Sequence, residues 1–410
     1  MALMATRFHE TTLPSGLRIA AEVMPAAASA AVGMFVRTGT RDEPRELMGV
    51  SHFLEHMMFK GSATRRGDAV NEAFDRIGAR NNAFTSHEMT AYHAHTIPEH
   101  ALEALGLVAD LLRPALRQED FDQERGVILE EIAMYEDNPL WTVYERVQEA
   151  YFGGHPLGYR VLGTPDSIQA LQRDSMKRYF EERYAPSNTV VVAAGNIDFD
   201  ALVRRAQEET DQWKSRGVPR VYPPLASNTA KLTFQDKRAT RAYMMFAWPG
   251  PDHSDPRRYA AALCAYVLGG QDGSRLYWSL IEPGIAVHAS TEHQGHDRSG
   301  QVIGSVVCSS DDVEQAGDIF TRECGNLRDS LTEGDLSRAR SMLATAVALA
   351  GESPSGRMQR IGMRMSTVGG YKSLEDELRT IQALSLTDLR DCLDDFPPVP
   401  LVSGCVVPPS

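Results

Sequence analysis

Residues 48–59 read Met-Gly-Val-Ser-His-Phe-Leu-Glu-His-Met-Met-Phe, and the interpretation of the chain begins with this segment. His52 and His56 are four positions apart, so on a helix they project from one face and can reach a single metal ion. Glu55 precedes the second histidine and can accept a proton from a water molecule on the metal without being a ligand itself. The order H-x-x-E-H is typical of one class of zinc peptidase. The segment therefore predicts a zinc site on a helix spanning about residues 46–60.

The residues around the two histidines argue for a buried helix. Two solvated histidines at a helix end would be the ordinary alternative to a metal site. The apolar side chains within and after the motif are Phe53, Leu54, Met57, Met58 and Phe59. Histidines on a largely buried helix need polar partners, which favours the metal site.

A second helix, predicted over residues 119–137, offers the third protein ligand that a catalytic zinc site usually has. Glu124 and Glu131 are seven positions apart and share one face of this helix. Glu131 could bind the metal while Glu124 orients a histidine. Spacing alone does not choose Glu131 over Glu130, and a solvated acidic face is the ordinary alternative for such a helix.

Several segments together resemble peptidase family M16, the pitrilysin or inverzincin group. The H-x-x-E-H motif is followed about 75 residues later by a helical glutamate, and the resemblance is dense over about residues 10–200. The other matching segments are Gly39–Glu43, Asn82–Ser86, Thr90–Tyr92, Glu124–Glu131, His155–Gly158 and Leu162–Pro165.

The resemblance implies a role for each matching position. Glu55 would be the general base, and Glu124 would hold a metal-binding histidine from outside the ligand set. The implied zinc ligands are His52, His56 and Glu131, which settles the choice between Glu130 and Glu131. The segment containing Asn82, Ala83, Phe84 and Thr85 resembles the edge strand on which the peptide substrate of these enzymes lies as an added β-strand.

The length of the chain and the order of its predicted elements indicate two α+β domains. A chain of 410 residues exceeds one ordinary hydrophobic core. We expect an N-terminal zinc-binding domain over 1–213, a polar, proline-rich linker over 214–230 and a C-terminal domain over 231–410. The resemblance implies two homologous α+β domains, which form half of a clamshell, so the chain should dimerise as a homodimer or with an M16-like partner.

Composition excludes some partner classes. The formal net charge is −13 and no basic stretch is present, which argues against nucleic acid. No apolar run approaches 18 residues, so no membrane span is predicted. The N-terminus is too short and too polar for a signal peptide, and the five cysteines show no metal-ligand spacing, so we expect a cytoplasmic chain with reduced thiols.

The chain departs from the family pattern in its second half. Many members carry an arginine and a tyrosine about seven residues apart that contact the substrate, and here Ile281 and Val287 stand at these positions. Neither side chain can donate a hydrogen bond. Three explanations are open: His288 or His293 substitutes, a partner chain supplies the donors, or the enzyme is slow or silent. Ordinary helix packing is the preferred role of the nearby Arg275, Tyr277 and Trp278.

These observations predict a zinc-dependent endopeptidase that cleaves peptides or unfolded polypeptide segments inside a closed dimeric chamber. The alternative is a weakly active or non-catalytic M16-like subunit, which needs a partner chain that supplies the missing arginine and tyrosine. The substrate and its cleavage preference do not follow from the sequence.

Overall fold

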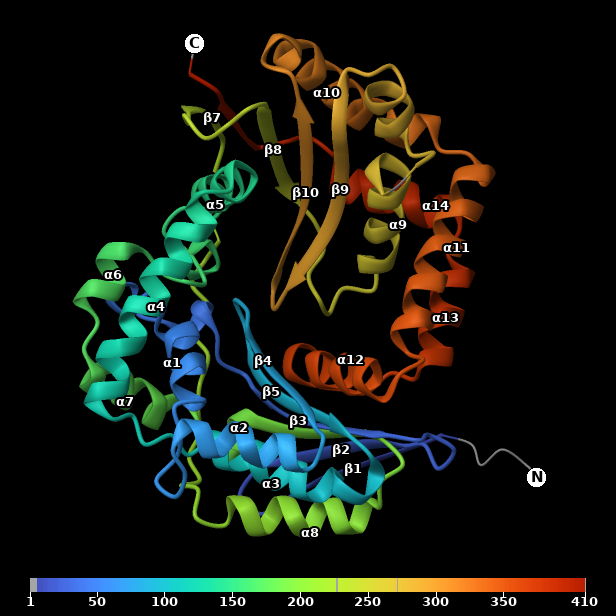
Figure 1. Cartoon of the computed structure of the whole chain (residues 1–410). Helices are drawn as coiled ribbons and strands as arrows, with labels where there is room; N and C mark the ends of the chain where they lie inside the picture. Colours follow the sequence, from blue (N-terminus) through green and yellow to red (C-terminus); the bar gives the residue numbers. More distant parts are fainter. Residues whose placement is uncertain (1–5, 226–227, 271, 410) are drawn as a thin grey trace. The chain divides into compact units, whose positions relative to one another are not determined.

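The computed structural model describes residues 6–225, 228–270 and 272–409. They form two compact units, each built around its own β-sheet (Figure 1). The first unit comprises the chain up to Ile132, Tyr159–Tyr222 and Leu349–Lys372. The second comprises Ala133–Gly158, Pro223–Ala348 and the chain from Ser373 onwards. Among the helices in these ranges, none has the length and apolarity needed to cross a membrane.

The first unit contains a six-stranded sheet in the order β1-β2-β6-β3-β5-β4. Only β2 and β6 pair in parallel among these strands. Every residue of β3 and β6 is buried, as expected for central strands with continuous apolar sequences. The strands are β1 (Arg7–Thr12), β2 (Arg18–Val23), β6 (Thr189–Gly195), β3 (Ala30–Val36), β5 (Thr90–Thr96) and β4 (Arg80–Thr85).

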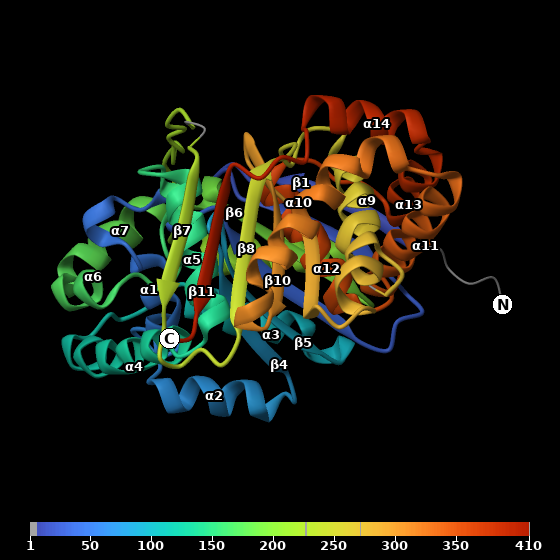
Figure 2. The same cartoon turned by 90° about the horizontal axis from the view of Figure 1, so that it is seen from above.

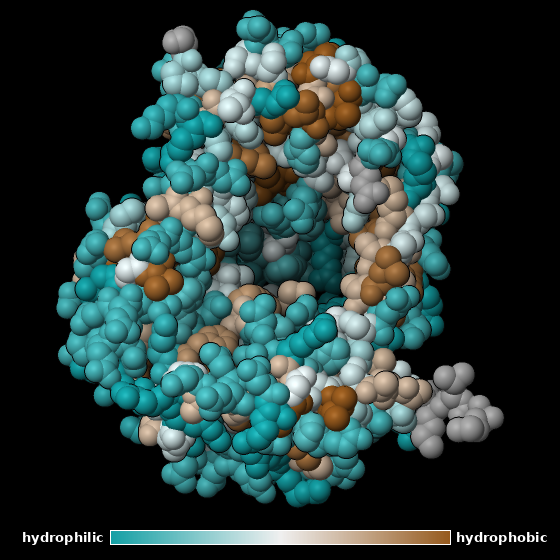
Figure 3. Space-filling view, viewed as in Figure 1, coloured by the Kyte–Doolittle hydropathy of each residue, from teal (hydrophilic) through white to brown (hydrophobic). Residues whose placement is uncertain are grey.

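Helices from distant parts of the sequence cover the two faces of this sheet. On one face, α3 (Ala101–Leu111) contacts β3 and β5, and α8 (Phe199–Thr210) packs on α3. On the other face, α12 (Pro354–Thr367) lies against β3 and β6 (Figure 1). Its Met358, Ile361 and Met365 join a core that also contains strand residues. Hydrophilic residues cover most of the visible surface around α2, α3 and α8 (Figure 3).

The helices beside β4 carry the predicted site. Helix α1 (Val50–Met58) packs against α4 (Gln118–Glu136) through Phe53 and Phe121, whose rings stack at 4.6 Å. Both rings are fully buried. This contact sets the two helices side by side. The other helices of this region are α2 (Gly67–Arg76), α6 (Pro165–Ala170) and α7 (Arg173–Arg183).

The second unit contains a five-stranded sheet in the order β7-β11-β8-β10-β9, most of which Figure 2 shows side by side. Helix α5 packs on β8 and β11, whereas α9 packs on β9 and α14. The Phe246 and Phe320 rings stack at 4.0 Å within the core between the sheet and α10. The strands are β7 (Ala230–Gln235), β11 (Val402–Val407), β8 (Ala242–Pro249), β10 (Ser299–Cys308) and β9 (Ala286–His296). The helices are α5 (Pro139–Phe152), α9 (Arg258–Gly269), α10 (Val313–Ser330), α11 (Glu333–Ala350), α13 (Leu374–Ala383) and α14 (Leu386–Asp395).

The two α+β units agree with the predicted fold class, but their boundaries differ from the expected 1–213, 214–230 and 231–410. Helix α5 belongs to the second unit and α12 to the first. The expected linker is divided at Tyr222, and its first part packs with the first unit. The physical reason is that each sheet needs a helix on a face that its own contiguous segment leaves uncovered. Residues 226 and 227 of this linker lie outside the described residues.

Both helices predicted around the site are present, as α1 and α4, and two features differ from what the sequence pattern indicates. The metal helix begins at Val50 and not near residue 46, because Gly49 has a left-handed φ of 92° and 3₁₀ turns precede it. Strand β9 was not expected. It is the edge strand of its sheet and has a polar sequence, so the apolar pattern of a buried strand is missing.

Candidate metal centre

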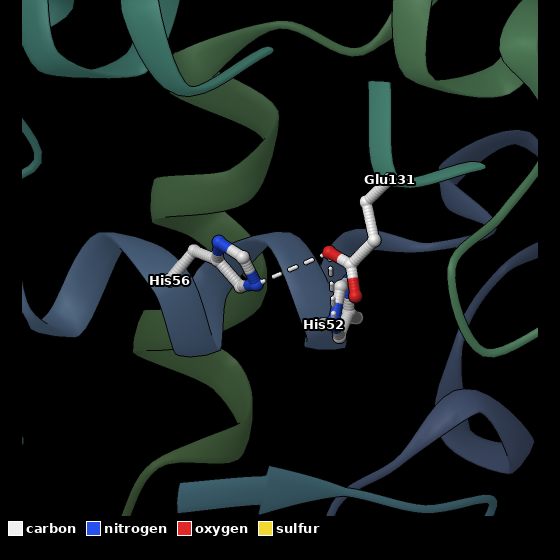
Figure 4. A group of neighbouring side chains, drawn as sticks. All are labelled: His52, His56 and Glu131. Carbon is white, nitrogen blue, oxygen red and sulfur yellow. Dashed lines mark ion pairs between the residues drawn. The ribbon is translucent and has the colours of Figure 1, made fainter. Parts of the chain in front are cut away.

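Three of the predicted residues converge between α1 and α4. His52 and His56 project from one face of α1, with their ring centroids 4.7 Å apart. The carboxylate of Glu131 on α4 points at both rings (Figure 4). Its Oε2 lies 3.8 Å from His52 Nε2 and 3.5 Å from His56 Nε2. Within the described ranges, no other cluster of three His, Cys, Asp or Glu side chains could hold a metal ion.

The donor atoms fit a zinc ion. Ligand atoms in a tetrahedral zinc site, each about 2.0–2.2 Å from the metal, are separated from one another by about 3.4 Å. The two separations from Glu131 are close to this value and longer than good hydrogen bonds. All three ligand atoms lie within 4.8 Å of one another. Two imidazoles and one carboxylate form a ligand set of catalytic zinc sites, in which the fourth position stays open.

Glu124 lies where a carboxylate can orient His56. Its Oε1 accepts a hydrogen bond of 2.8 Å from His56 Nδ1, which leaves Nε2 of that ring directed at Glu131. Its other oxygen forms a 2.5 Å ion pair with Lys60. The side chain of Glu124 is only 5% exposed, so solvent screens these interactions little. The arrangement is the carboxylate–histidine pair that supports many metal ligands.

Burial and neighbouring charges set the protonation states. Burial, assisted by the adjacent His56, lowers the pKa of His52 to about 3, so this imidazole is neutral and has a lone pair for a metal. Burial opposes protonation of His56, but the hydrogen bond and charge of Glu124, together with the charges of Glu131 and Glu55, outweigh it and raise the pKa of His56. Burial would likewise raise the pKa of Glu124, yet His56 and Lys60 lower it. A metal ion therefore competes with a proton at His56 and not at His52.

Glu55 lies on α1 between the two histidines and has its own partner. Its Oε2 accepts a hydrogen bond of 2.6 Å from the hydroxyl of Thr85 at the end of β4. Burial raises the pKa of Glu55, against the effect of this hydrogen bond, which lowers it. A raised pKa moves a carboxylate towards the range in which it both accepts and returns protons near neutral pH.

The predicted substrate-binding residues lie on β4, the last strand in the sheet order. Side chains alternate along a strand, so Thr85 and Ala83 share one face while Phe84 and Asn82 share the other. Thr85 contacts α1 through Glu55, whereas Phe84 packs with the core on the α12 face. Asn82 Oδ1 accepts a hydrogen bond from the backbone N–H of Ala83. Their predicted role as a peptide-binding edge stays a prediction.

The departures in the second half have clear structural settings. Ile281 is partly buried against the core of the second unit, and Val287 is 58% exposed at the start of β9. His288 Nε2 lies within hydrogen-bond distance of two serine hydroxyls, and His293 Nε2 donates to the Pro251 carbonyl. Both histidines thus have partners within the second unit.

The packing role expected for the three residues near Ile281 applies only in part. Arg275 donates to Asp335 and to the Ser330 carbonyl, as a packed structural arginine does. Trp278 differs, because it is 60% exposed.

The sequence analysis identified neither Lys60, which pairs with Glu124, nor the hydrogen bond from Thr85 to Glu55. Both contacts join residues that are far apart in the sequence. A cation one turn after H-x-x-E-H, in reach of the carboxylate that holds the second histidine, is the signal that could have identified Lys60.

The fold and the H-x-x-E-H site together define a zinc metalloprotease of the M16 type, and comparisons with known proteins agree. Residues 18–165 match the family model "Insulinase (Peptidase family M16)", and residues 170–343 match "Peptidase M16 inactive domain". The chain belongs to peptidase family M16, a family of zinc metalloproteases.

Similar proteins cover almost the whole chain. The uncharacterized zinc protease YmxG of Bacillus subtilis is 32% identical over 378 residues, which is 92% of both chains. An uncharacterized zinc protease of Streptomyces coelicolor is 33% identical over 393 residues, 93% of this chain and 85% of its own. Among solved structures, a protease from Helicobacter pylori has a TM-score of 0.91 at 18% identity and covers 98% of this chain and 100% of its own. A putative M16-like peptidase from Alicyclobacillus acidocaldarius has a TM-score of 0.85 at 21% identity and covers 99% of both chains.

Proposed function

We propose that this chain is a zinc-dependent endopeptidase that cleaves peptides or unfolded polypeptide segments. The observation that carries the proposal is one cluster on α1 and α4. It contains a neutral His52, a His56 held by Glu124, and the Glu131 carboxylate within 3.8 Å of both rings. Glu55 stands beside this cluster with a separate hydrogen-bond partner.

In the proposed mechanism, His52, His56 and Glu131 hold zinc. Bound zinc supplies a Lewis acid that polarises the scissile carbonyl and lowers the pKa of a water molecule. Glu55 accepts a proton from the attacking water and returns it to the leaving amine. Thr85 holds the Glu55 carboxylate in place through its hydroxyl.

We propose that the substrate backbone binds along β4. A strand at the end of a sheet offers unpaired N–H and C=O groups, and an extended peptide can add to it as a further strand. Such pairing provides affinity with little dependence on sequence, which suits peptides and unfolded segments. The proposed chamber is formed by two copies of this chain or by this chain with an M16-like partner. The cytoplasmic location stays a prediction.

The alternative, a subunit that needs a partner for activity, is supported by Ile281 and Val287. Neither can donate the hydrogen bonds that the family arginine and tyrosine make. A test of the purified chain by itself separates the two possibilities, because the first predicts full cleavage without a partner and the alternative predicts weak cleavage or none.

The test of the proposed function is a cleavage assay with an internally quenched, unstructured peptide, combined with zinc analysis of the same samples. Wild type should bind one zinc ion per chain and cleave. Glu55→Gln should retain zinc and lose activity by at least about 10²-fold, because the general base is absent. Glu130→Gln is the matched control, since Glu130 is exposed and precedes the ligand Glu131. Equal cleavage by wild type and Glu55→Gln would refute the mechanism, and a zinc-loaded but inactive wild type would favour the subunit alternative.

A further inference from the structure

An arginine from the segment that leads out of the first unit is buried beside the catalytic elements. Arg220 has a side chain only 2% exposed. Its Nε and Nη2 donate to the two oxygens of Asp42 at 3.0 and 2.8 Å, and Nη2 also donates to the Glu88 carbonyl at 2.6 Å. One guanidinium group thus joins two loops that are remote from each other in the sequence.

Further buried charges complete this cluster. Arg183 contacts Asp42 at 2.7 Å, and Arg41 pairs with Glu88 at 2.6 Å. The carboxylates of Asp42 and Glu88 are 1% and 5% exposed. Burying several charges is costly, and such clusters add little net stability even when they are fully paired. Fixing a particular geometry is the better explanation for a cluster of this kind.

The cluster fixes the turn of the β4–β5 hairpin. Glu88 lies in the turn that follows Thr85, and the neighbouring loop donates backbone hydrogen bonds to this turn. Thr40 N–H donates to the Ser86 carbonyl at 3.3 Å, and Arg41 N–H donates to the His87 carbonyl at 2.8 Å. The position of Thr85, and with it the hydrogen bond to Glu55, depends on this turn.

The residue that follows Asp42 connects this cluster to the start of α1. Glu43 follows Asp42 directly, and its buried carboxyl accepts hydrogen bonds from the backbone N–H groups of Gly49 and Ser51 at 2.8 and 2.7 Å. A carboxyl there satisfies N–H groups that the first turn of a helix leaves unpaired. Arg220 therefore contacts the loops that hold both partners of the Thr85–Glu55 hydrogen bond.

We propose that Arg220 is a positioning residue for catalysis. By binding Asp42 and the Glu88 carbonyl together, it keeps the β4–β5 hairpin in register with α1, so that Thr85 meets Glu55. The segment that leads to the second unit is thereby coupled to the site. This inference rests on the proposed peptidase function, since the effect is expressed in turnover.

Arg220→Gln is the direct test. Asp42 keeps Arg183, so the variant leaves no carboxylate of the cluster wholly unpaired. We expect wild-type zinc content and a kcat lower by about 10- to 100-fold, since a displacement of about 1 Å in a catalytic group can cost about 10²-fold. Arg220→Lys, which keeps the charge but not the two-pronged contact, should recover part of the loss. Arg216→Gln is the matched control, because within the described residues the Arg216 guanidinium forms no hydrogen bond or ion pair and only its backbone carbonyl accepts a bond, from the Ser187 hydroxyl. Its kcat should stay within about twofold of wild type.

Two further measurements distinguish positioning from a general structural effect. Hydrogen exchange of the amides in residues 82–92 should accelerate in Arg220→Gln and not in Arg216→Gln. The double variant with Thr85→Val should lose less activity than the product of the single losses, since both changes break the same linkage.

The outcomes separate this inference from the proposed function. A wild type that fails to cleave would overturn the proposed function and this inference with it. A wild type that cleaves, with an equally active Arg220→Gln, would overturn the positioning role alone. Loss of zinc from Arg220→Gln would also overturn the positioning role. So would a double variant with Thr85→Val whose loss of activity equals the product of the two single losses. If Arg220→Gln fails to fold, Arg220→Lys decides, because unchanged kcat and hydrogen exchange in that variant would contradict the role.

Discussion

Replacing Glu124 with glutamine should weaken zinc binding about 10- to 100-fold while leaving the fold intact. Glu124 joins His56 at 2.8 Å and Lys60 at 2.5 Å, and its side chain is 5% exposed. A charge-assisted hydrogen bond with so little solvent screening contributes about 1.5–3 kcal/mol, and a neutral amide retains part of it. The remaining loss of about 1.4–2.7 kcal/mol corresponds to the stated change in affinity, which is the usual range for carboxylates that support a metal-bound histidine.

The assay is competition for zinc between the protein and a chelating dye at fixed pH. Glu130→Gln is again the control, because it removes one negative charge from the exposed side of α4. With zinc at saturation, the Glu124→Gln enzyme should keep most of its turnover, since Glu55 and Thr85 are untouched. A zinc Kd within twofold of wild type would show that Glu124 does not support His56 and would refute the reasoning.

Three further predictions concern the base, the start of α1 and the packing of α12. Thr85→Val removes a hydrogen bond that lowers the pKa of Glu55, so the acid limb of the kcat/KM profile should move to higher pH; a limb that stays in place or moves to lower pH would contradict this. Burial raises the pKa of Glu43 from about 4.5 in the unfolded chain to about 7 in the folded protein. The folded state therefore holds this proton more tightly, so the stabilisation from Glu43 is complete below pH 4.5 and is lost as the pH rises through about 7. Urea unfolding should therefore show wild type losing up to about 3 kcal/mol relative to Glu43→Gln across that interval, and a constant difference would contradict it. Gly362→Ala places a methyl group against a buried phenylalanine ring, so it should lower the free energy of unfolding by about 1–3 kcal/mol and lower the Tm. Gly370→Ala adds its methyl group in open space and should leave the Tm unchanged. Equal melting temperatures for these two variants would mean that the α12 contact is looser than described.

The residues of the candidate metal centre could be grouped from the sequence because their spacing is local. His52, Glu55 and His56 lie within one turn and a half of α1, so their spacing alone determines which side chains share a face. Glu131 required the family resemblance, because Glu130 has the same chemistry and lies one position away. The structure separates them, since Glu131 faces the histidines while Glu130 is exposed.

The remaining parts of the site depend on contacts between distant residues, which leave no periodic pattern in the sequence. Arg220 meets Asp42 across 178 positions, in a polar segment that looked like a simple linker. Helix α12 covers the sheet of the first unit, and nothing local to its own sequence indicates this long-range contact. Strand β9 escaped prediction because its polar edge-strand sequence lacks an apolar pattern.

The most direct test is a crystal of Glu55→Gln grown with zinc and measured on both sides of the zinc absorption edge. The account predicts one strong anomalous peak per chain, about 2.0–2.2 Å from Nε2 of His52, Nε2 of His56 and an oxygen of Glu131. An anomalous peak elsewhere, or zinc-free density between these three side chains in a crystal that holds zinc at another place, would contradict the claim that α1 and α4 form the catalytic metal centre.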